Sequence, residues 1–161
     1  MKVAVALSGG VDSSVAAALL AQAGHDVVGI TLQQWPRDDE AANEKHGGCC
    51  SLSAVEDARR VARVIGIPYF VWNLEREFAE RVIGPFHRGY VDGRTPNPCV
   101  SCNAFVRFDL MLSRVLALGF DAMATGHYAR ILPAEAGPEL HCAADGTKDQ
   151  SYVLYHLDSS R

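Results

Sequence analysis

The stretch Ala6-Leu7-Ser8-Gly9-Gly10-Val11-Asp12-Ser13-Ser14 decides the fold of this chain, because it joins an apolar run to an alanine-rich run. The apolar run is typical of a buried strand, and the alanine-rich run is typical of a helix. Two adjacent glycines let the backbone turn sharply and approach a ligand without a Cβ in the way. Asp12, Ser13 and Ser14 are residue types that cap helix N-termini, where free N–H groups attract phosphates. The stretch therefore predicts a phosphate-binding turn between a strand and a helix.

This turn differs from the two common nucleotide-binding motifs. No Gly-Lys-Ser/Thr follows at the spacing of the mononucleotide P-loop, and the glycines lack the Gly-x-Gly-x-x-Gly spacing of dinucleotide-binding folds. A plain glycine-rich turn without a ligand is the alternative. Residues 8–13 nevertheless resemble the Ser-Gly-Gly-x-Asp-Ser signature of the PP-loop ATP pyrophosphatases. Those enzymes split ATP between its α and β phosphates and activate an oxygen by adenylation, so the resemblance implies an ATP site.

Length and composition predict one soluble globular domain. The chain has 161 residues, of which 48% are hydrophobic and 21% charged, and it contains no low-complexity tract. Such values are typical of a packed core and exclude a disordered chain. No apolar run is long enough to cross a bilayer, and the first residues lack the pattern of a signal peptide. We therefore expect a cytoplasmic protein with no membrane partner.

Charge and cysteine content restrict the chemistry further. The formal net charge is −4, so a nucleic-acid partner would have to be held by a local basic patch. Five cysteines, an odd number, argue against a disulfide framework and for reduced or chemically used thiols. Candidates for a phosphate-facing patch are four arginines, which equally suit a solvated helix face: Arg88, Arg94, Arg107 and Arg114.

Apolar runs alternate with segments of helical periodicity along the chain. This alternation predicts an α/β fold, with a doubly wound parallel sheet that binds ligands beyond the carboxyl ends of its strands. A small antiparallel hairpin is expected at the sheet edge, with strands at 128–132 and 140–143. Residues 33–50 are expected to form a long exposed loop. Other strands are predicted at 3–7, 27–32, 68–73 and 122–125, and helices at 13–23, 51–65, 74–90 with a break at Gly84-Pro85, 99–118 and 148–157.

The second informative stretch is Arg94-Thr95-Pro96-Asn97-Pro98-Cys99-Val100-Ser101-Cys102-Asn103. Its prolines stiffen a loop that delivers a Cys-x-x-Cys pair to the start of a helix, where the helix dipole lowers the pKa of a thiol. The pair fits half of a zinc site that His46, Cys49 and Cys50 would complete, a redox dithiol, or a nucleophile. Purely structural cysteines are the fourth possibility.

Seven motifs occur in an order that resembles the bacterial tRNA-specific 2-thiouridylases, which thiolate the wobble uridine of certain tRNAs. Each motif alone is modest, but the combination is specific and covers nearly the whole chain. The motifs are Ser8 to Ser14, Gln34-Trp35, Cys50, Gly93 to Pro98, Cys102-Asn103, Ala124 to Tyr128, and Lys148 to Tyr152.

The resemblance implies roles for individual residues. The catalytic cysteine falls on Cys102, with Asp12 and Cys99 in the same catalytic set. The implied ATP-binding residues are Ala6, Leu7, Ser8, Gly9, Gly10, Val11, Asp12, Ser13, Leu32 and Gly126. The implied tRNA-binding residues are Asn97, Pro98 and Cys99 at the target base, with His127, Lys148, Asp149 and Gln150 elsewhere.

The implied reaction has two steps. Adenylation converts the uracil O2 into a good leaving group, with Mg²⁺ and the helix dipole neutralising the departing pyrophosphate. A cysteine sulfur then attacks the activated carbon. The family carries a second cysteine in a later part of its chain, which receives persulfide sulfur or resolves the disulfide. We therefore expect residues 1–161 to be a PP-loop domain without the family's central and C-terminal domains. A persulfide-carrying protein is the expected sulfur donor.

Three alternatives stay open at this point. Many family members have aspartate at the position of Cys99, and members with cysteine there suggest that Cys99 and Cys102 ligate an iron–sulfur cluster together with a third cysteine. The chain would otherwise be another PP-loop ligase or sulfurtransferase, such as one resembling argininosuccinate synthase or a guanine-monophosphate synthetase domain. The third alternative is a domain that binds ATP or tRNA without turnover.

Overall fold

The computed structural model of the chain describes residues 1–36 and 52–157. They divide into two compact units, of which unit 1 comprises Met1–Arg76 and Arg114–Gly126, and unit 2 comprises Glu77–Ser113 and His127–Arg161. Most of the predicted loop at 33–50 lies outside the described residues, and so do His46, Cys49 and Cys50. The expected exposed loop is wrong at its start, because Gln33 is the last residue of a strand and the Gln33 and Gln34 side chains are buried. Whether the chain acts as a single domain stays a prediction.

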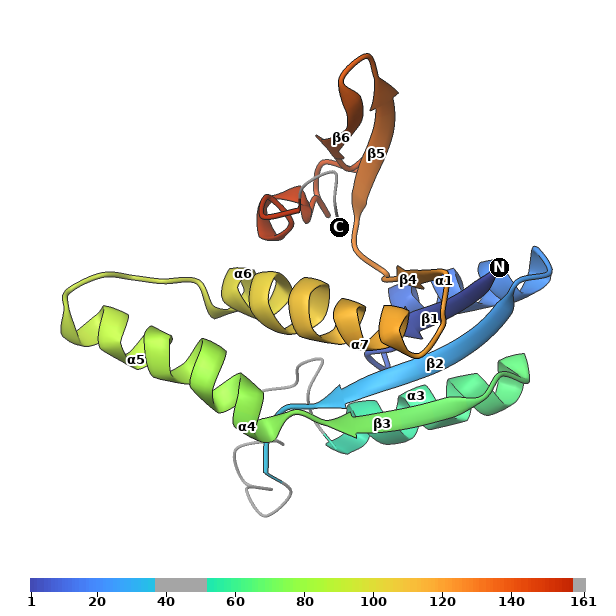
Figure 1. The fold of residues 1–161 in the computed structure, drawn as a ribbon, viewed down its shortest axis with the longest axis horizontal. Helices are drawn as coiled ribbons and strands as arrows, with labels where there is room; N and C mark the ends of the chain where they lie inside the picture. The colour runs from blue at the N-terminus through green and yellow to red at the C-terminus, as the bar shows by residue number, and fades with distance from the viewer. Residues whose placement is uncertain (37–51, 158–161) are drawn as a thin grey trace. The chain divides into compact units, whose positions relative to one another are not determined.

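Unit 1 is built on a parallel sheet of four strands (Figure 1). The strands are β1 (Lys2–Ala6), β2 (Asp26–Gln33), β3 (Tyr69–Asn73) and β4 (Ala122–Ala124). Their order is β3-β2-β1-β4, and the central β1 pairs Val5 with Gly29 on one side and with Ala124 on the other. The predicted parallel sheet is therefore confirmed.

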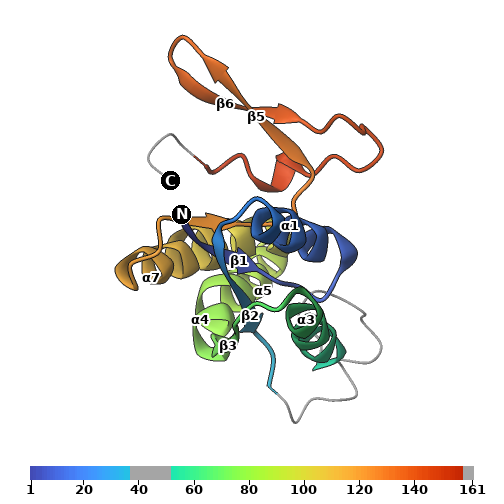
Figure 2. The ribbon, with the colours of Figure 1, turned by 90° about the vertical axis from the view of Figure 1, so that its right-hand side faces the viewer.

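Helices cover both faces of this sheet (Figure 2). Helices α1 (Val11–Gln22) and α3 (Leu52–Ile65) pack together over one face, while the last turn of α7 lies on the other side. The core joins apolar side chains of β1 to Ala17 of α1 and to Ala58 and Ala62 of α3. In α3 the small apolar residues recur at helical spacing, whereas Arg59 and Arg60 pair with acidic residues on the outside. The doubly wound α/β class is thus confirmed.

The helical segment after β3 runs without the predicted break. It consists of α4 (Glu75–Phe78), a π-helical turn η1 (Ala79–Ile83) and α5 (Gly84–Val91). The expected interruption at Gly84-Pro85 is wrong because the helical turn just before the proline contains one extra residue. The Gly84 N–H donates to the carbonyl of Ala79, five residues back. A wider turn relieves the clash between a proline ring and the preceding helical turn.

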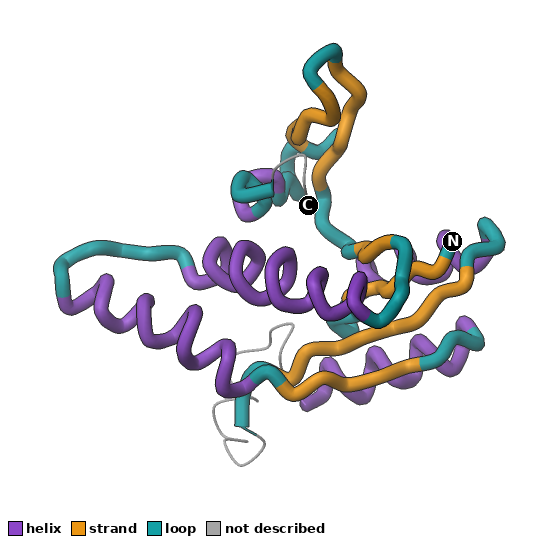
Figure 3. The backbone as a smooth tube through the Cα atoms, in the orientation of Figure 1, coloured by secondary structure: helices purple, strands orange, loops and turns teal. Residues whose placement is uncertain are grey.

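The second long helical segment is continuous, as predicted. It begins with α6 (Pro98–Cys102), continues as the π-helical η2 (Asn103–Met111) and ends with α7 (Leu112–Ala117) (Figure 3). The hairpin is also present, with β5 (Ala129–Ala134) antiparallel to β6 (Gly137–Cys142). Within the described residues these two strands pair only with each other, so the hairpin is a separate sheet and does not extend the edge of the parallel one.

The predicted terminal helix at 148–157 is wrong. Only a single 3-10 turn, η3 (Ser151–Val153), forms there. The Asp149 carboxylate accepts hydrogen bonds from the Ala143 N–H at 2.7 Å and from the Ser151 hydroxyl at 2.7 Å. A short acidic side chain that binds nearby backbone in this way competes with helix formation.

Candidate active site

The glycine-rich loop follows Leu7, whose backbone N–H and carbonyl both form hydrogen bonds with residues of β2. The Leu7 N–H donates to the carbonyl of Ile30 at 2.9 Å, and the Leu7 carbonyl accepts the buried Thr31 hydroxyl at 2.8 Å. The Leu7 side chain is itself buried, and it fills the space beside Gly29, where a Cβ would lie 2.5 Å from the leucine Cδ1. The position at which the chain leaves β1 is therefore set by contacts across the sheet.

Gly9 is required by its conformation and by its surroundings. Its φ is +78°, in the left-handed region that favours glycine. A Cβ at this position would lie 2.4 Å from the carbonyl oxygen of Ala54, in the first turn of α3. The sharp turn of the loop and its close contact with a neighbouring helix therefore depend on the same residue.

Hydroxyl groups hold the loop closed, although they do not cap the helix in the expected way. The N-cap of α1 is Gly10, which has no side chain to accept a bond. The buried Ser13 hydroxyl accepts from the Ser8 N–H at 3.2 Å and lies 3.2 Å from the Gly10 carbonyl, to which it donates. The Ser14 hydroxyl donates to the same carbonyl at 2.7 Å. The serines thus stabilise the loop from within.

Gly126 brings the end of β4 against the first turn of α1. A Cβ on Gly126 would lie 2.4 Å from the backbone nitrogen of Ser13 and 2.7 Å from the carbonyl carbon of Asp12. Because β4 is the neighbour of β1 on the side away from β2, this contact lies where the strand order reverses. Ligands of open α/β sheets bind at such a position, beyond the carboxyl ends of the strands. The first N–H groups of α1 are also present there, as at other phosphate sites.

The predicted ATP-binding residues all belong to unit 1 and gather at one edge of the sheet. Ala6 to Ser13 and Gly126 are brought into contact as described. Leu32 lies in the carboxyl half of β2, at the same edge, but its side chain is 7% exposed and belongs to the core. Any contribution from Leu32 to a ligand therefore comes from its backbone.

The cysteine stretch forms the start of a helix, as predicted. Asn97 is the N-cap of α6, and its side-chain oxygen accepts from the Cys99 N–H at 2.9 Å. Pro98 occupies the first helical position, which suits a residue without an N–H. Cys99 is exposed and Cys102 is half-buried, and their spacing of three residues places them on one face of the helix.

Asn103 and Gly89 support this stretch in ways that the sequence did not predict. The amide nitrogen of the buried Asn103 donates to the Cys99 carbonyl at 3.1 Å, which fixes the turn that carries both cysteines. Its Oδ1 accepts no hydrogen bond from any described residue. Gly89 of α5 lies against Pro96, so close that a Cβ would be 2.8 Å from the proline Cγ. The Cys102-Asn103 motif pointed to Asn103 without giving it a role, and no sequence signal pointed to Gly89.

The predicted tRNA-binding residues outside the cysteine stretch gather in unit 2. Gln150 is bonded twice to Tyr128: its N–H donates to the Tyr128 carbonyl at 2.8 Å, and its Oε1 accepts the Tyr128 N–H at 3.0 Å. The Lys148 Nζ lies 5.3 Å from the centre of the Tyr128 ring. These bonds tie residues 148–150 to the chain just after His127.

Two of these predicted tRNA-binding residues, His127 and Asp149, have shifted pKa values. Burial, with a contribution from the Arg107 charge, lowers the pKa of His127 to about 4, and its ring lies 6.1 Å from that of Phe108. Hydrogen bonds from the Ala143 N–H and the Ser151 hydroxyl lower the pKa of Asp149. At neutral pH His127 is therefore an uncharged imidazole, suited to hydrogen bonding and stacking and unable to neutralise a phosphate.

The family of the chain follows from a match along its whole length. Residues 1–161 match the family model described as "tRNA methyl transferase HUP domain". The chain belongs to this family. Solved structures with a similar fold include a predicted subunit of tRNA methyltransferase from Methanocaldococcus jannaschii. The match covers 78% of this chain and 52% of the chain of that structure, at 21% identity and a TM-score of 0.51. A glutamine-dependent NAD⁺ synthetase from Acinetobacter baumannii covers 78% of this chain and 22% of its own at 21% identity and a TM-score of 0.55. Both likenesses concern the fold alone.

Curated relatives of this HUP domain carry a more specific name. A protein of Lachnoclostridium phytofermentans is 52% identical over 157 residues, which cover 97% of this chain and 44% of the relative. One of Beutenbergia cavernae is 56% identical over 164 residues, which cover all of this chain and 42% of the relative. Both are named tRNA-specific 2-thiouridylase MnmA. The HUP domain thus spans less than half the length of these relatives.

The described part of the HUP domain contains no ready-made metal centre. No group of three or more histidine, cysteine or acidic side chains gathers there. The described cysteines, Cys99, Cys102 and Cys142, form no disulfide. The proposed zinc partners of the Cys-x-x-Cys pair lie outside the described residues. Within the same limits, no helix is long and apolar enough to cross a membrane.

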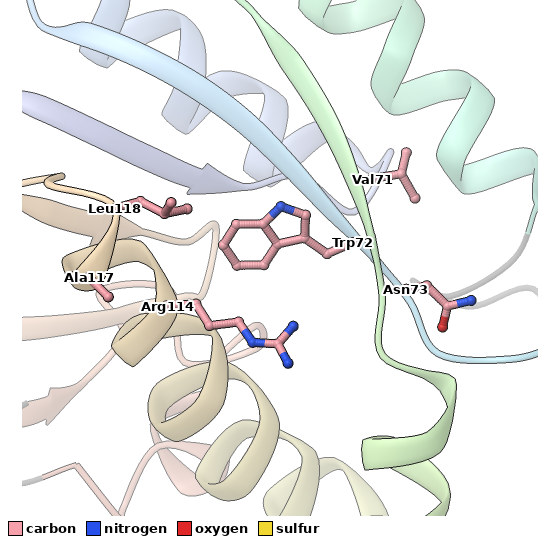
Figure 4. A pocket seen from close by; sticks show the side chains of 6 residues that line it. All are labelled: Val71, Trp72, Asn73, Arg114, Ala117 and Leu118. Carbon is pink, nitrogen blue, oxygen red and sulfur yellow. The ribbon is translucent and has the colours of Figure 1, made fainter.

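Unit 1 also contains a pocket of about 490 Å³ that none of the predicted catalytic, ATP-binding or tRNA-binding residues lines (Figure 4). The Trp72 ring and the Arg114 side chain both extend into it, between β3 and the end of α7. Of the four arginines considered for a phosphate patch, Arg114 thus belongs to unit 1 and the other three to unit 2. The pocket is lined by Val71, Trp72, Asn73, Arg114, Ala117 and Leu118.

Proposed function

We propose that this HUP domain is the ATP-using part of a tRNA uridine 2-sulfurtransferase of the cytoplasm. The observation that carries the proposal is the close approach of Gly126 to the first turn of α1, which brings the end of β4 to the glycine-rich loop at the point where the strand order reverses. The 52% to 56% identity to proteins named tRNA-specific 2-thiouridylase gives the reaction its chemical class.

ATP would be held by backbone rather than by long side chains. The loop from Ala6 to Ser13 offers N–H groups and the positive end of the α1 dipole to the phosphates. Asp12, in the first turn of α1, is the carboxylate of this loop, and it suits Mg²⁺ that keeps most of its bonds to water and phosphate. Bound Mg²⁺ would supply charge neutralisation for the departing pyrophosphate.

The reaction then follows from the two chemically distinct stretches. The uracil O2 attacks the α phosphate of ATP and releases pyrophosphate, which leaves AMP attached at that oxygen. A persulfide on Cys102, loaded by a sulfur-donor protein, attacks C2 of the ring and displaces AMP. The S–S bond is next broken by a second thiol, which ends as a disulfide with Cys102 and leaves sulfur on the uridine. Cys102 is half-buried at the end of α6, so its side chain is partly accessible.

The remaining predicted residues have roles in holding tRNA. Asn97 and Pro98 fix the start of α6, and Cys99 is exposed on the same face as Cys102, where it would meet the target base. His127 acts as a neutral hydrogen-bonding group, since its pKa of about 4 keeps it uncharged. Lys148, exposed beside Tyr128, is the cation of this cluster, and Asp149 and Gln150 fix the segment that carries it.

Tests of this function begin with pyrophosphate release from ATP, measured with and without tRNA. We expect tRNA to stimulate the release. Cys102→Ser should preserve stimulated release and abolish thiolation when the donor and resolving thiol are supplied, whereas the matched variant Cys142→Ser should change neither. Unchanged thiolation by Cys102→Ser would remove its role as the nucleophile.

A second candidate function is binding of ATP or tRNA without turnover. It is favoured by the glycine-rich loop, whose backbone N–H groups and helix N-terminus suit phosphate binding and supply no nucleophile. ATP binding without any pyrophosphate release, in the presence or absence of tRNA, would support it. The iron–sulfur alternative for Cys99 and Cys102 has a separate test, since anaerobic reconstitution that produces no iron-dependent absorbance would exclude it.

A further inference from the structure

Three aromatic rings form an exposed row in unit 2, close to the cysteine helix. The Tyr155 and His156 rings lie 4.0 Å apart between centroids, with an angle of 33° between their planes. The Phe105 ring lies 6.2 Å from that of His156. Phe105 is 47% exposed and Tyr155 is 62% exposed. We call Phe105, Tyr155 and His156 the aromatic row.

Apolar packing anchors the segment that carries Tyr155 and His156. A small hollow is lined by Asn103, Ala104, Phe108, Val153, Leu154, His156 and Leu157, and η3 contacts α6. Val153 and Leu154 are buried, at 6% and 5% exposure, so the segment is anchored while Tyr155 faces outward. The Arg81 guanidinium donates to the Phe105 carbonyl at 3.2 Å and to Asp109 at 2.8 Å, which fixes the backbone that carries Phe105. The rings are therefore presented on a firm base.

Phe105 follows Cys102 by three residues, in the π-helical η2 that continues α6, so both residues belong to one continuous helical segment. Three residues advance about 4.5 Å along an α-helix axis. That distance is similar to the step of about 3.4 Å between neighbouring stacked bases in a strand. A nucleotide next to the base at Cys102 would thus lie at the height of Phe105.

We propose that the aromatic row is a stacking surface for a tRNA base that flanks the target uridine; this proposal rests on the proposed function. Chemistry on a base requires that the base leave its stack, and its neighbours then lose a stacking partner. Exposed aromatic rings replace that partner, because every base has a flat face that stacks on them regardless of sequence. The row would hold the anticodon open while Cys102 is supplied with the uridine.

The test uses an anticodon stem-loop RNA that carries 2-aminopurine directly 3′ of the wobble uridine. Binding to the chain should change the fluorescence of this base, and Phe105→Ala or Tyr155→Ala should remove the change and weaken binding about five- to hundredfold. Phe105→Trp should restore both. Phe70→Ala is the matched control, since Phe70 is 56% exposed on β3 and lies outside the row.

Salt dependence separates stacking from phosphate contacts. Loss of a phosphate contact reduces the slope of log affinity against log salt concentration by about 1, whereas loss of stacking lowers affinity by the same factor at every salt concentration. We expect parallel lines for the wild type and for Phe105→Ala. Binding by the Phe105→Ala and Tyr155→Ala variants that equals wild type, with the fluorescence change intact, would overturn the stacking surface and leave the proposed function standing. Failure of the wild-type chain to bind RNA at all would overturn both.

Discussion

Replacing Gly126 with alanine tests whether the close approach of β4 to α1 builds the nucleotide site. The new Cβ would lie 2.4 Å from the Ser13 nitrogen and 2.7 Å from the Asp12 carbonyl carbon, and these backbone atoms cannot rotate away. Ordinary contact requires that β4 and α1 separate by about 1 Å. Overpacking of this kind costs about 1–3 kcal/mol of the free energy of unfolding. A displacement of about 1 Å in a binding site also costs up to about a hundredfold in function.

We therefore expect Gly126→Ala to lower stability by about 2 kcal/mol and to weaken ATP binding about ten- to hundredfold. Urea unfolding and equilibrium dialysis with ATP measure the two effects. Gly146→Ala is the matched control, because a Cβ on Gly146 would meet no atom within 4 Å and its φ is not positive. Its effect on stability should stay within about 0.5 kcal/mol. If the two variants have the same stability and ATP affinity, the nucleotide site does not depend on the contact at Gly126.

Three further predictions concern the loop and the His127 cluster. Gly9→Ala should destabilise the fold more than Gly24→Ala, because both glycines have φ near +80° but only Gly9 meets another backbone, at Ala54; equal unfolding free energies would contradict this. Thr31→Val removes the hydroxyl that donates to the Leu7 carbonyl and should cost about 1 kcal/mol in urea unfolding and weaken ATP binding, whereas an unchanged ATP affinity would separate that bond from the site. The pKa of His127 is lowered to about 4 in the fold, so the unfolded chain binds the proton more readily and stability should fall as the pH drops from about 6.5 to about 4. His127→Gln should flatten that fall by about 1–3 kcal/mol, and equal pH profiles for the wild type and His127→Gln would refute the lowered pKa.

Hydrophobic periodicity was enough to predict the sheet, because buried parallel strands need unbroken apolar runs and their crossover helices need an apolar stripe. β1 and α3 follow this rule closely: Val3 to Val5 are buried together, and Ala58 and Ala62 face the same core. The glycine-rich loop was equally visible, since two adjacent glycines are rare without a turn that needs them.

Predictions from local sequence were wrong where one side chain or one backbone hydrogen bond changes the secondary structure. The Asp149 carboxylate accepts hydrogen bonds from the Ala143 N–H and the Ser151 hydroxyl, and hydrophobic periodicity does not reveal such bonds. Pro85 was expected to break a helix, but a π-helical turn one residue earlier makes room for its ring. The contact of Gly126 with Ser13 joins residues far apart in the sequence, so only the fold reveals why a side chain is excluded there.

The contact between Gly126 and α1 has a consequence for the order in which this protein is made. The glycine-rich loop leaves the ribosome more than a hundred residues before Gly126 does, and at about 5–20 residues per second that is a delay of roughly 5 to 20 seconds. During this interval β1 has β2 as a partner, but its other edge is unpaired and the glycine-rich loop lacks its contact with Gly126. Closing so long a loop is also the slow, entropically costly part of assembling unit 1. Under the proposed function, capture of nucleotide by the nascent chain should therefore begin only when β4 has been synthesised, and ATP affinity would report that unit 1 has folded.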